Sequence, residues 1–259
     1  MLKNDAWEGY IKPSRIFGNL YFVGTRPAST HVIDTGDGLI VIDPGYQESL
    51  YLVINNMWEV GLDPKDIKYI LLTHCHYDHT DATKALASLS GAKVCLPELD
   101  LPLYKGEIYH YDFRPFDVDI LIKDGDVISL GNTSVKCVST PGHTDGTTSF
   151  FFDVTDGKDT YRAGMHGGIG MNSMKADFLT KRGLPTDCRQ KFLDGLDKVQ
   201  NEKVDITLGN HVGQNDTEGK LVRLGKEDKN PFIDASEWGI FINKRRERMY
   251  ELQKEDPIK

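Results

Sequence analysis

The amino-acid sequence predicts a layered α/β sandwich, in which strands form sheets and helices cover the sheets from outside. Three observations support this prediction. Short apolar runs of strand length recur along the chain, amphipathic stretches with helical spacing lie outside them, and no repeat or Pro/Gly/Ser-rich linker divides the 259 residues. We therefore expect a single domain over residues 1–259.

The first part of the chain shows short strands separated by turns. Strands are expected at residues 19–24, 31–35 and 39–43. The last of these is apolar enough to be buried on both faces. Residues 48–60 then place apolar side chains at the spacing of an amphipathic helix.

The same reasoning predicts the remaining elements. A buried strand at residues 68–72 is followed by a helix at 80–90, which Gly91 ends. Further strands are expected at 93–96, 127–130, 134–139, 147–153, 160–163 and 205–208, and further helices at 187–200 and, near the end of the chain, at 236–254.

The composition argues against several classes of protein. The 39 acidic residues outnumber the 31 basic ones, and the formal net charge of −8 disfavours a nucleic-acid partner, because contact with phosphates requires clustered Lys and Arg. No stretch approaches the roughly 18 consecutive apolar residues of a membrane helix. The four cysteines have neither CxxC spacing nor the density of a disulfide scaffold. Since Asp5 and Glu8 stand where a signal peptide would have its apolar region, we expect a cytoplasmic protein with free thiols.

The strongest functional signal is a dense cluster of metal-binding residue types. His74, His76, Asp78 and His79 lie on the turn that follows the buried strand 68–72. Imidazole and carboxylate groups are ordinary ligands of Zn²⁺, at about 2.0–2.2 Å. Imidazoles packed together without a cation would leave polar nitrogens unpaired, so the cluster predicts a metal site.

Additional ligands must come from distant parts of the chain. His143 and His211 each lie just after a predicted strand, and strand ends are where open α/β sheets place their sites. We expect both to join the cluster. For His31 and His110, a structural or exposed position is at least as well supported as metal ligation.

These motifs resemble those of the metallo-β-lactamase superfamily. The resemblance depends on HxHxDH at residues 74–79, PGHT at 141–144, Ile-Asp-Pro-Gly at 42–45 and the late His211, and it covers roughly residues 15 to 211. It implies a four-layer αβ/βα sandwich, the metallo-β-lactamase fold. Within the superfamily, the pattern is similar to the lactamase subclass that binds its metals through His and Asp alone.

The resemblance implies two Zn²⁺ ions per chain, each held by three residues. The first ion would be bound by His74, His76 and His143, and the second by Asp78, His79 and His211. The two ions would share a water molecule and lower its pKa, so that hydroxide forms near pH 7. Asp78 is the expected catalytic residue, because its carboxylate would also orient that hydroxide.

The chain departs from most hydrolases of the superfamily at one position. Their metal-bridging Asp has no counterpart in residues 161–168, and the His/Asp lactamase subclass also lacks it. That subclass commonly has a serine-containing turn there, which helps to hold the carboxylate of the antibiotic. Met165 and Gly167 stand in its place, so we expect inefficient β-lactam hydrolysis that serines at these two positions would improve. Met165 and His166 are candidate substrate residues, His166 being alternatively a spare ligand or a structural residue, and Asp43 is a candidate for orienting a ligand.

We therefore predict a zinc-dependent hydrolase that uses a metal-bridging hydroxide to open an amide or ester bond in a small β-lactam-like or lactone substrate. Several alternatives come from other classes. A thioesterase of the glyoxalase II type, an iron-dependent persulfide dioxygenase and a tRNA-processing nuclease use the bridging Asp, and a flavodiiron reductase has Glu where His76 stands. A non-catalytic metal-binding member of the superfamily is the last alternative.

Loops are expected to form the walls of the substrate pocket. The candidates are residues 25–30, the aromatic-rich residues 101–115, and residues 167–184, which are long enough to form a lid.

Overall fold

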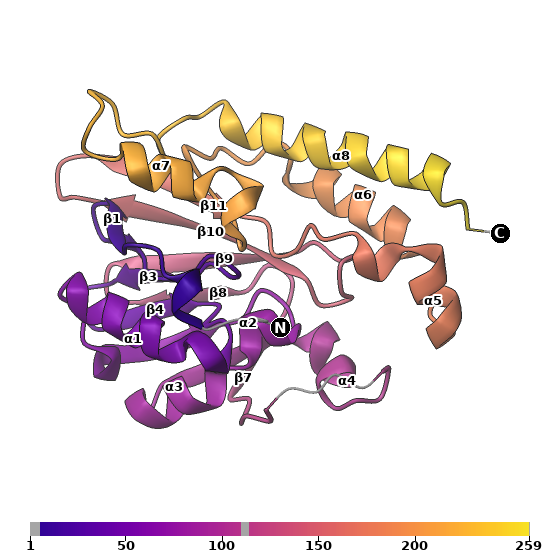
Figure 1. Ribbon diagram of the computed structural model, residues 1–259, viewed down its shortest axis with the longest axis horizontal. Coiled ribbons are helices and arrows are strands. Elements are labelled where there is room, and N and C mark those ends of the chain that lie inside the picture. Colours follow the sequence, from indigo (N-terminus) through magenta and orange to yellow (C-terminus); the bar gives the residue numbers. More distant parts are fainter. Residues whose placement is uncertain (1–5, 110–113, 259) are drawn as a thin grey trace.

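Two β-sheets pack face to face between two layers of helices in the computed structural model, which describes residues 6–109 and 114–258 (Figure 1). Helices α1 (Leu50–Glu59) and α3 (Thr83–Ser90) cover the outer face of the first sheet. Helices α6 (Cys188–Val199) and α8 (Glu237–Glu255) cover the outer face of the second. The four-layer αβ/βα sandwich is therefore confirmed.

Shorter helical segments lie in the connections. The α-helical ones are α2 (Tyr77–Thr80), α4 (Leu101–Tyr104), α5 (Ala176–Arg182) and α7 (Thr217–Arg223). Short 3-10 turns occupy Ala6–Gly9, Gln47–Ser49, Pro64–Asp66, Glu98–Asp100, Asn172–Met174 and Val212–Gln214.

The first sheet contains seven strands that lie side by side in chain order. They are β1 (Ser14–Phe17), β2 (Leu20–Phe22), β3 (His31–Asp34), β4 (Leu39–Ile42), β5 (Ile67–Leu71), β6 (Lys93–Pro97) and β7 (Ile120–Ile122). The pairs from β1 to β4 are antiparallel, whereas β4 to β7 are parallel. Because parallel strands end at the same edge of a sheet, the loops after β4 and β5 leave the sheet together.

The second sheet contains five strands in the order β12-β11-β10-β9-β8. Their bounds are β8 (Val127–Leu130), β9 (Thr133–Ser139), β10 (Thr148–Thr155), β11 (Thr160–Met165) and β12 (Ile206–Leu208). Strand β10 is antiparallel to both β9 and β11, and β12 is parallel to β11. Strands β9, β11 and β12 therefore share one direction, and the loops that follow them leave at one edge.

Apolar side chains hold the layers together on both faces of the first sheet. In β4, Ile40 and Ile42 face the second sheet within the central core, whereas Leu39 and Val41 face α1 and α3. All four are buried. This two-sided burial explains why the segment is apolar throughout and does not alternate with polar residues.

Most of the expected elements are present within a few residues of their predicted bounds, including the C-terminal helix, which is α8. The helix expected at 80–90 is divided, because α2 ends at Thr80 and α3 begins at Thr83. Strands β1 and β7 and helices α4, α5 and α7 were not predicted, since three to seven residues are too few to show a clear period. No helix in the described residues is long and apolar enough to cross a bilayer.

Trp238 attaches α8 to the second sheet, and its truncation should destabilise the fold. It is 2% exposed, its indole N–H donates to the carbonyl of Val199 over 2.9 Å, and its ring contacts Phe151 edge-on. We expect Trp238→Ala to lower the free energy of unfolding by about 3–5 kcal/mol, because it leaves a cavity and removes a buried hydrogen bond. Urea denaturation provides the measurement. Trp58, which is 61% exposed, supplies the control, and an equal effect of Trp58→Ala would contradict this assignment.

Candidate metal centre

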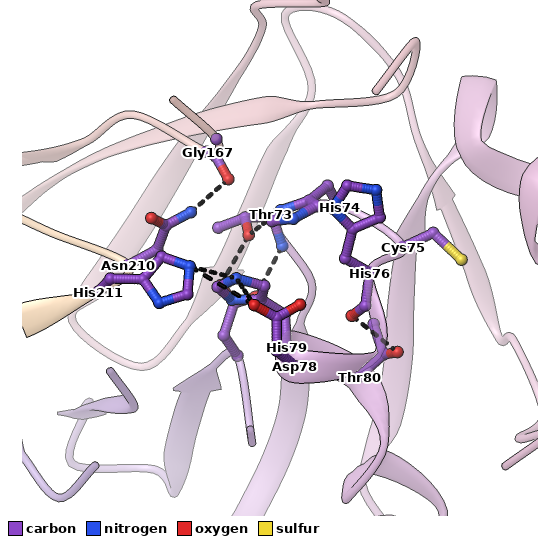
Figure 2. Close-up of polar contacts among 12 residues, drawn as sticks. Thr73, His74, Cys75, His76, Asp78, His79, Thr80, Gly167, Asn210 and His211 are labelled. Carbon is purple, nitrogen blue, oxygen red and sulfur yellow. Dashed lines mark hydrogen bonds and ion pairs between the residues drawn. The ribbon is translucent and has the colours of Figure 1, made fainter. Parts of the chain in front are cut away.

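The predicted ligands lie at the edge of the sandwich where strands of both sheets end. Figure 2 shows His74, His76, Asp78, His79 and His211 close together there. The loops that carry them hold Asp43 after β4, His74 to His79 after β5, His143 after β9, His166 after β11 and His211 after β12. Strand directions in the two sheets thus bring together side chains that are far apart in the sequence. The amide of Asn210 joins two of these loops by donating to the carbonyl of Gly167 over 2.6 Å.

A first triad consists of His74, His76 and His143. Nδ1 of His76 lies 2.9 Å from Nε2 of His143, which in turn lies 3.2 Å from Nε2 of His74. Nitrogen ligands at about 2.0–2.1 Å from a tetrahedral zinc ion lie roughly 3.4 Å apart. The three nitrogens are therefore close to the spacing that one cation requires.

A second triad consists of Asp78, His79 and His211. The Nε2 atoms of His79 and His211 are 3.2 Å apart, and each lies 3.5 Å from Oδ2 of Asp78. His74 of the first triad has a ligand atom within 4.8 Å of those of Asp78 and His79, so the two triads adjoin. The structure thus brings together all six residues that the sequence singled out.

Asp43 orients one imidazole of each triad. Its buried carboxylate accepts from Nδ1 of His79 over 2.9 Å and from the hydroxyl of Thr73 over 2.6 Å. Since that hydroxyl has given its hydrogen to Asp43, it accepts from Nδ1 of His74 at 3.0 Å. Both imidazoles therefore carry hydrogen on Nδ1 and present the lone pair of Nε2 to the site.

Backbone carbonyls orient two further imidazoles in the same way. Nδ1 of His143 donates to the carbonyl of Gly170 over 2.6 Å, and Nδ1 of His211 donates to that of Pro27 over 2.7 Å. In these two residues as well, Nε2 is left as the unprotonated atom that faces the site. Four imidazoles are thus held in the tautomer that a metal ligand needs.

The nitrogen and oxygen atoms of the two triads fit divalent cations. Burial holds the pKa values of His74 and His76 well below their usual range and lowers that of His143 to about 4, so the first triad is neutral near pH 7. Lone pairs at 2.9–3.2 Å repel one another unless a proton or a metal ion lies between them. In the second triad, burial acts to lower the pKa of His79, but the carboxylates of Asp78 and Asp43 raise it overall. Protons and metal ions therefore compete for this second position.

Asp78 supplies the negative charge among these imidazoles. Burial acts to raise its pKa, but the surrounding imidazoles, first of all His79 and His211, lower it overall. The carboxylate is therefore ionised at neutral pH. Its side chain is 20% exposed, so it faces both the second triad and the open space beside it.

Asp100 supports the loops that follow β5 and β9, which carry predicted ligands. It was not identified from the sequence. Its fully buried carboxylate accepts from the backbone N–H of Cys75 and Gly146 and from the hydroxyl of Thr144, over 2.7–3.0 Å. Burial raises the pKa of Asp100 to about 6 against the effect of these donors. Cys75 itself points away from the imidazoles into the core under α1 and α3, as expected from its place between two ligands (Figure 2).

The prediction that Met165 contacts the substrate is wrong. This last residue of β11 is fully buried in the core between the sheets. The expected improvement by serines at 165 and 167 is wrong for a second reason. A Cβ atom at Gly167 would lie 2.1 Å from the carbonyl oxygen of Thr148, so no side chain fits there.

His166 is also buried, at 1% exposure, and its ring lies near that of Phe192. Its Nδ1 accepts from the N–H of Gly168 over 3.4 Å, which supports the turn after β11. Of its three expected roles, these contacts favour the structural one. His31 is buried in β3 with its ring edge-on to Phe22, and His110 lies outside the described residues.

A pocket of about 560 Å³ opens beside the imidazoles. Residues 167–184 contribute to its wall as expected, through Gly168 to Gly170, Asn172, Ser173 and Phe178. Residues 25–30 do not line it within the described part of the chain, although they supply the carbonyl that orients His211. Residues 101–115 border an adjoining apolar pocket of about 290 Å³ through Leu103, Ile108 and Tyr109. Their Tyr111 and Phe113 lie outside the described residues.

Comparison with known proteins adds a family and relatives. A model of the metallo-beta-lactamase superfamily matches residues 23–156. The probable polyketide biosynthesis zinc-dependent hydrolase PksB of Bacillus subtilis is 34% identical over 113 residues, 44% of each chain. The hydroxyacylglutathione hydrolase of Maricaulis maris is 31% identical over 116 residues, 42% of this chain and 40% of that one. The chain thus spans less than half the length of these curated relatives.

Solved structures match over nearly the whole chain. BJP-1, a subclass B3 metallo-beta-lactamase of Bradyrhizobium japonicum, has a TM-score of 0.86 at 28% identity and covers 96% of both chains. The metallo-beta-lactamase GOB-18 from Elizabethkingia meningoseptica has a TM-score of 0.84 at 28% identity, with 99% of this chain and 97% of that one covered.

The position of Asp100 leads to a prediction about metal affinity. An amide in place of the carboxylate keeps one acceptor oxygen and turns an N–H₂ group toward a donor, so Asp100→Asn should lower the free energy of unfolding by about 1–3 kcal/mol. Zinc affinity should fall by about 10- to 100-fold, because both ligand loops lose a support. Urea denaturation of the metal-free protein and zinc titration against a competing chelator measure the two effects. Asp159→Asn, at an exposed turn, is the control, and wild-type zinc affinity in Asp100→Asn would contradict the supporting role.

Proposed function

The chain belongs to the metallo-β-lactamase superfamily, and we propose that it is a zinc-dependent hydrolase with two metal ions that opens an amide or ester bond, as in a β-lactam or a lactone. The observation that carries the proposal is the pair of adjoining triads whose unprotonated nitrogens and one carboxylate face a pocket. An ion held by three residues would keep coordination positions for water or substrate, which is typical of catalytic and not of structural zinc sites.

Bound divalent cations would supply Lewis acidity, which polarises a carbonyl group and lowers the pKa of water. The chain's own residues supply orientation and proton handling. Asp78 is ionised and partly exposed to the pocket, so its carboxylate can accept a hydrogen bond from the attacking water and hold its lone pair toward the substrate. Asp43 and the carbonyls of Gly170 and Pro27 keep the imidazoles in place during the reaction.

A thioesterase of the hydroxyacylglutathione hydrolase type is the second candidate. The match to the enzyme of Maricaulis maris and to others of that name favours it. The sequence of β11, Thr-Tyr-Arg-Ala-Gly-Met, argues against it, because it offers no carboxylate at the strand end where the resemblance places a bridging Asp. We therefore rank it below the amide or ester hydrolase.

The pocket and the cysteines suggest the setting in which the protein acts. A cavity of about 560 Å³ matches a small-molecule substrate. All four cysteines are free, and Cys75, Cys95 and Cys137 are buried without a disulfide, which fits a reducing compartment such as the cytoplasm.

A hydrolysis panel tests the proposal. The zinc-loaded protein is assayed with penicillins, carbapenems, N-acyl-homoserine lactones and S-acyl-glutathione thioesters. We expect turnover of a lactam or lactone that a chelator abolishes and added zinc restores. Preference for the thioester would establish the second candidate, and no turnover of any amide, ester or thioester by fully zinc-loaded protein would overturn the hydrolase.

Metal analysis should find about two zinc ions per chain, since the two triads use six different residues. Elemental analysis of freshly purified protein provides the count. His211→Ala should lower it to about one ion, because it removes a ligand of the second triad alone. One ion per wild-type chain, or iron in place of zinc, is the result that would refute the dinuclear zinc site.

Asp78→Asn should reduce kcat by roughly 10²-fold or more while much of the metal stays bound. The amide still offers one oxygen to a cation, but it cannot accept a proton or orient water as a carboxylate does. Steady-state kinetics and metal content are measured on the same preparation. Asp37→Asn, in an exposed turn, is the control. A kcat within tenfold of the wild-type value, with both metals present, would show that Asp78 does not act in the reaction.

A further inference from the structure

Arg245 brings a cation into the wall of the metal pocket. It belongs to the C-terminal helix α8, and its side chain lines the pocket together with His211 and Gln214. Its Nη2 donates to the carbonyl of Gln214 over 3.0 Å. Gln214 ends the 3-10 turn that follows His211, so the guanidinium lies against the loop that carries the last predicted ligand.

Among the residues that the structure describes, Arg245 has no carboxylate partner. Its Nε atom is buried and makes no hydrogen bond with any described residue. Burial lowers its pKa, and no acidic neighbour raises it. Two other arginines of α8 differ in this respect, because Arg246 pairs with Asp197 and Arg248 pairs with two glutamates.

A second donor without a partner lies nearby. Since Nδ1 of His166 accepts from the N–H of Gly168, the hydrogen of the neutral imidazole is on Nε2. That buried nitrogen has no partner in the described part of the chain. Burial, followed by the charges of His143 and Arg245, lowers the pKa of His166 to about 3, which places the guanidinium within electrostatic reach of this imidazole. Nε of Arg245 and Nε2 of His166 are thus two buried donors without an acceptor among the described residues.

A structural role accounts for only part of this arrangement. The guanidinium carbon lies 4.8 Å from the centroid of the Phe241 ring, and Nη2 supports Gln214. A neutral side chain could make either contact. A partly buried guanidinium without a counter-ion costs free energy, and among the described residues no carboxylate pairs with Arg245 to offset that cost.

We infer that Arg245 is a specificity-determining residue that binds an anionic group of the substrate, most simply a carboxylate. The inference rests on the proposed function insofar as the substrate occupies the metal pocket. It defines the substrate class as an amide, lactam or ester with a carboxylate beside the scissile carbonyl. The guanidinium offers the planar fork of N–H groups that carboxylates bind in pairs, and it lies in the same pocket as both triads.

Binding of a matched pair of probes tests the inference without turnover. The probes are N-phenylacetylglycine, which has a carboxylate, and N-phenylacetylglycinamide, which is its neutral counterpart. Calorimetric titration of the zinc-loaded protein gives both dissociation constants. Because zinc itself prefers carboxylates, the informative quantity is how the ratio of the two constants changes with the variant.

We expect Arg245→Gln to reduce the preference for the carboxylate by about 10- to 150-fold and to leave binding of the amide within about threefold. Arg245→Lys should retain part of the preference, because it keeps the charge but not the fork. Arg248→Gln removes the same charge from the exposed face of α8 and should leave the ratio at the wild-type value. Thermal unfolding and metal content are measured for each variant, because a purely structural residue would change those quantities and weaken both probes equally.

An unchanged ratio in Arg245→Gln, equal weakening of the two probes, or no binding of the carboxylate by the wild-type protein would overturn the inference. The proposed hydrolase fails separately. A wild-type protein that binds the carboxylate through Arg245 but hydrolyses nothing in the panel would keep the subsite and lose the hydrolase. If the protein hydrolyses substrates of the panel but Arg245→Gln leaves the ratio of kcat/KM for anionic and neutral substrates unchanged, the hydrolase stands and the subsite is refuted.

Discussion

The orientation of the predicted metal ligands depends first on the hydrogen bonds that the buried carboxylate of Asp43 accepts. It accepts two hydrogen bonds from Thr73 and one from His79, and through the Thr73 hydroxyl it also orients His74. One carboxylate therefore sets the tautomer of an imidazole in each triad. Its own backbone has a φ of +52°, unusual for a residue other than glycine, and this turn at the end of β4 aims the side chain across to the loop after β5.

The packing around His143 shows how tightly the second sheet is fitted to this centre. A Cβ atom at Gly168 would lie 2.6 Å from the His143 ring, and one at Gly170 would lie 3.0 Å from it. Gly142, at φ +131°, has Phe192 of α6 within 2.6 Å of the same hypothetical atom. Glycine at these positions lets backbone approach the imidazole closely enough for the Gly170 carbonyl to hold it. The packing of the second sheet against α6 and the position of the His143 imidazole therefore depend on the same group of contacts, which Gly142, Gly168 and Gly170 make.

The predicted ligands and the outer walls of the pocket come from different parts of the fold, which suggests how such a fold accommodates different substrates. The triads are held by strands and by buried hydrogen bonds, so their chemistry depends on rigid elements. The outer walls include Phe178 of α5 and Arg245 of α8, which lie outside the two sheets and orient none of the four imidazoles described above. Phe178 and Arg245 belong to those walls, and our proposal places the selection of the substrate there.

Local sequence determined the strands, the larger helices and the residue types of all six predicted ligands, because apolar periodicity and a turn such as His-Cys-His-Tyr-Asp-His can be recognised over a few residues. Short strands such as β1 and β7 were not predicted, because they form only through pairing with neighbouring strands. Tertiary structure alone decided the roles of Asp100, Met165 and Arg245. Asp100 meets Cys75 and Gly146 at separations of 25 and 46 residues, and Met165 turned out to face the opposite sheet. Arg245 is one of several basic residues in a charged helix, and only the folded chain separates it from any acidic partner. A residue's type sets what it can bind, whereas its burial and its distant neighbours decide whether it does so.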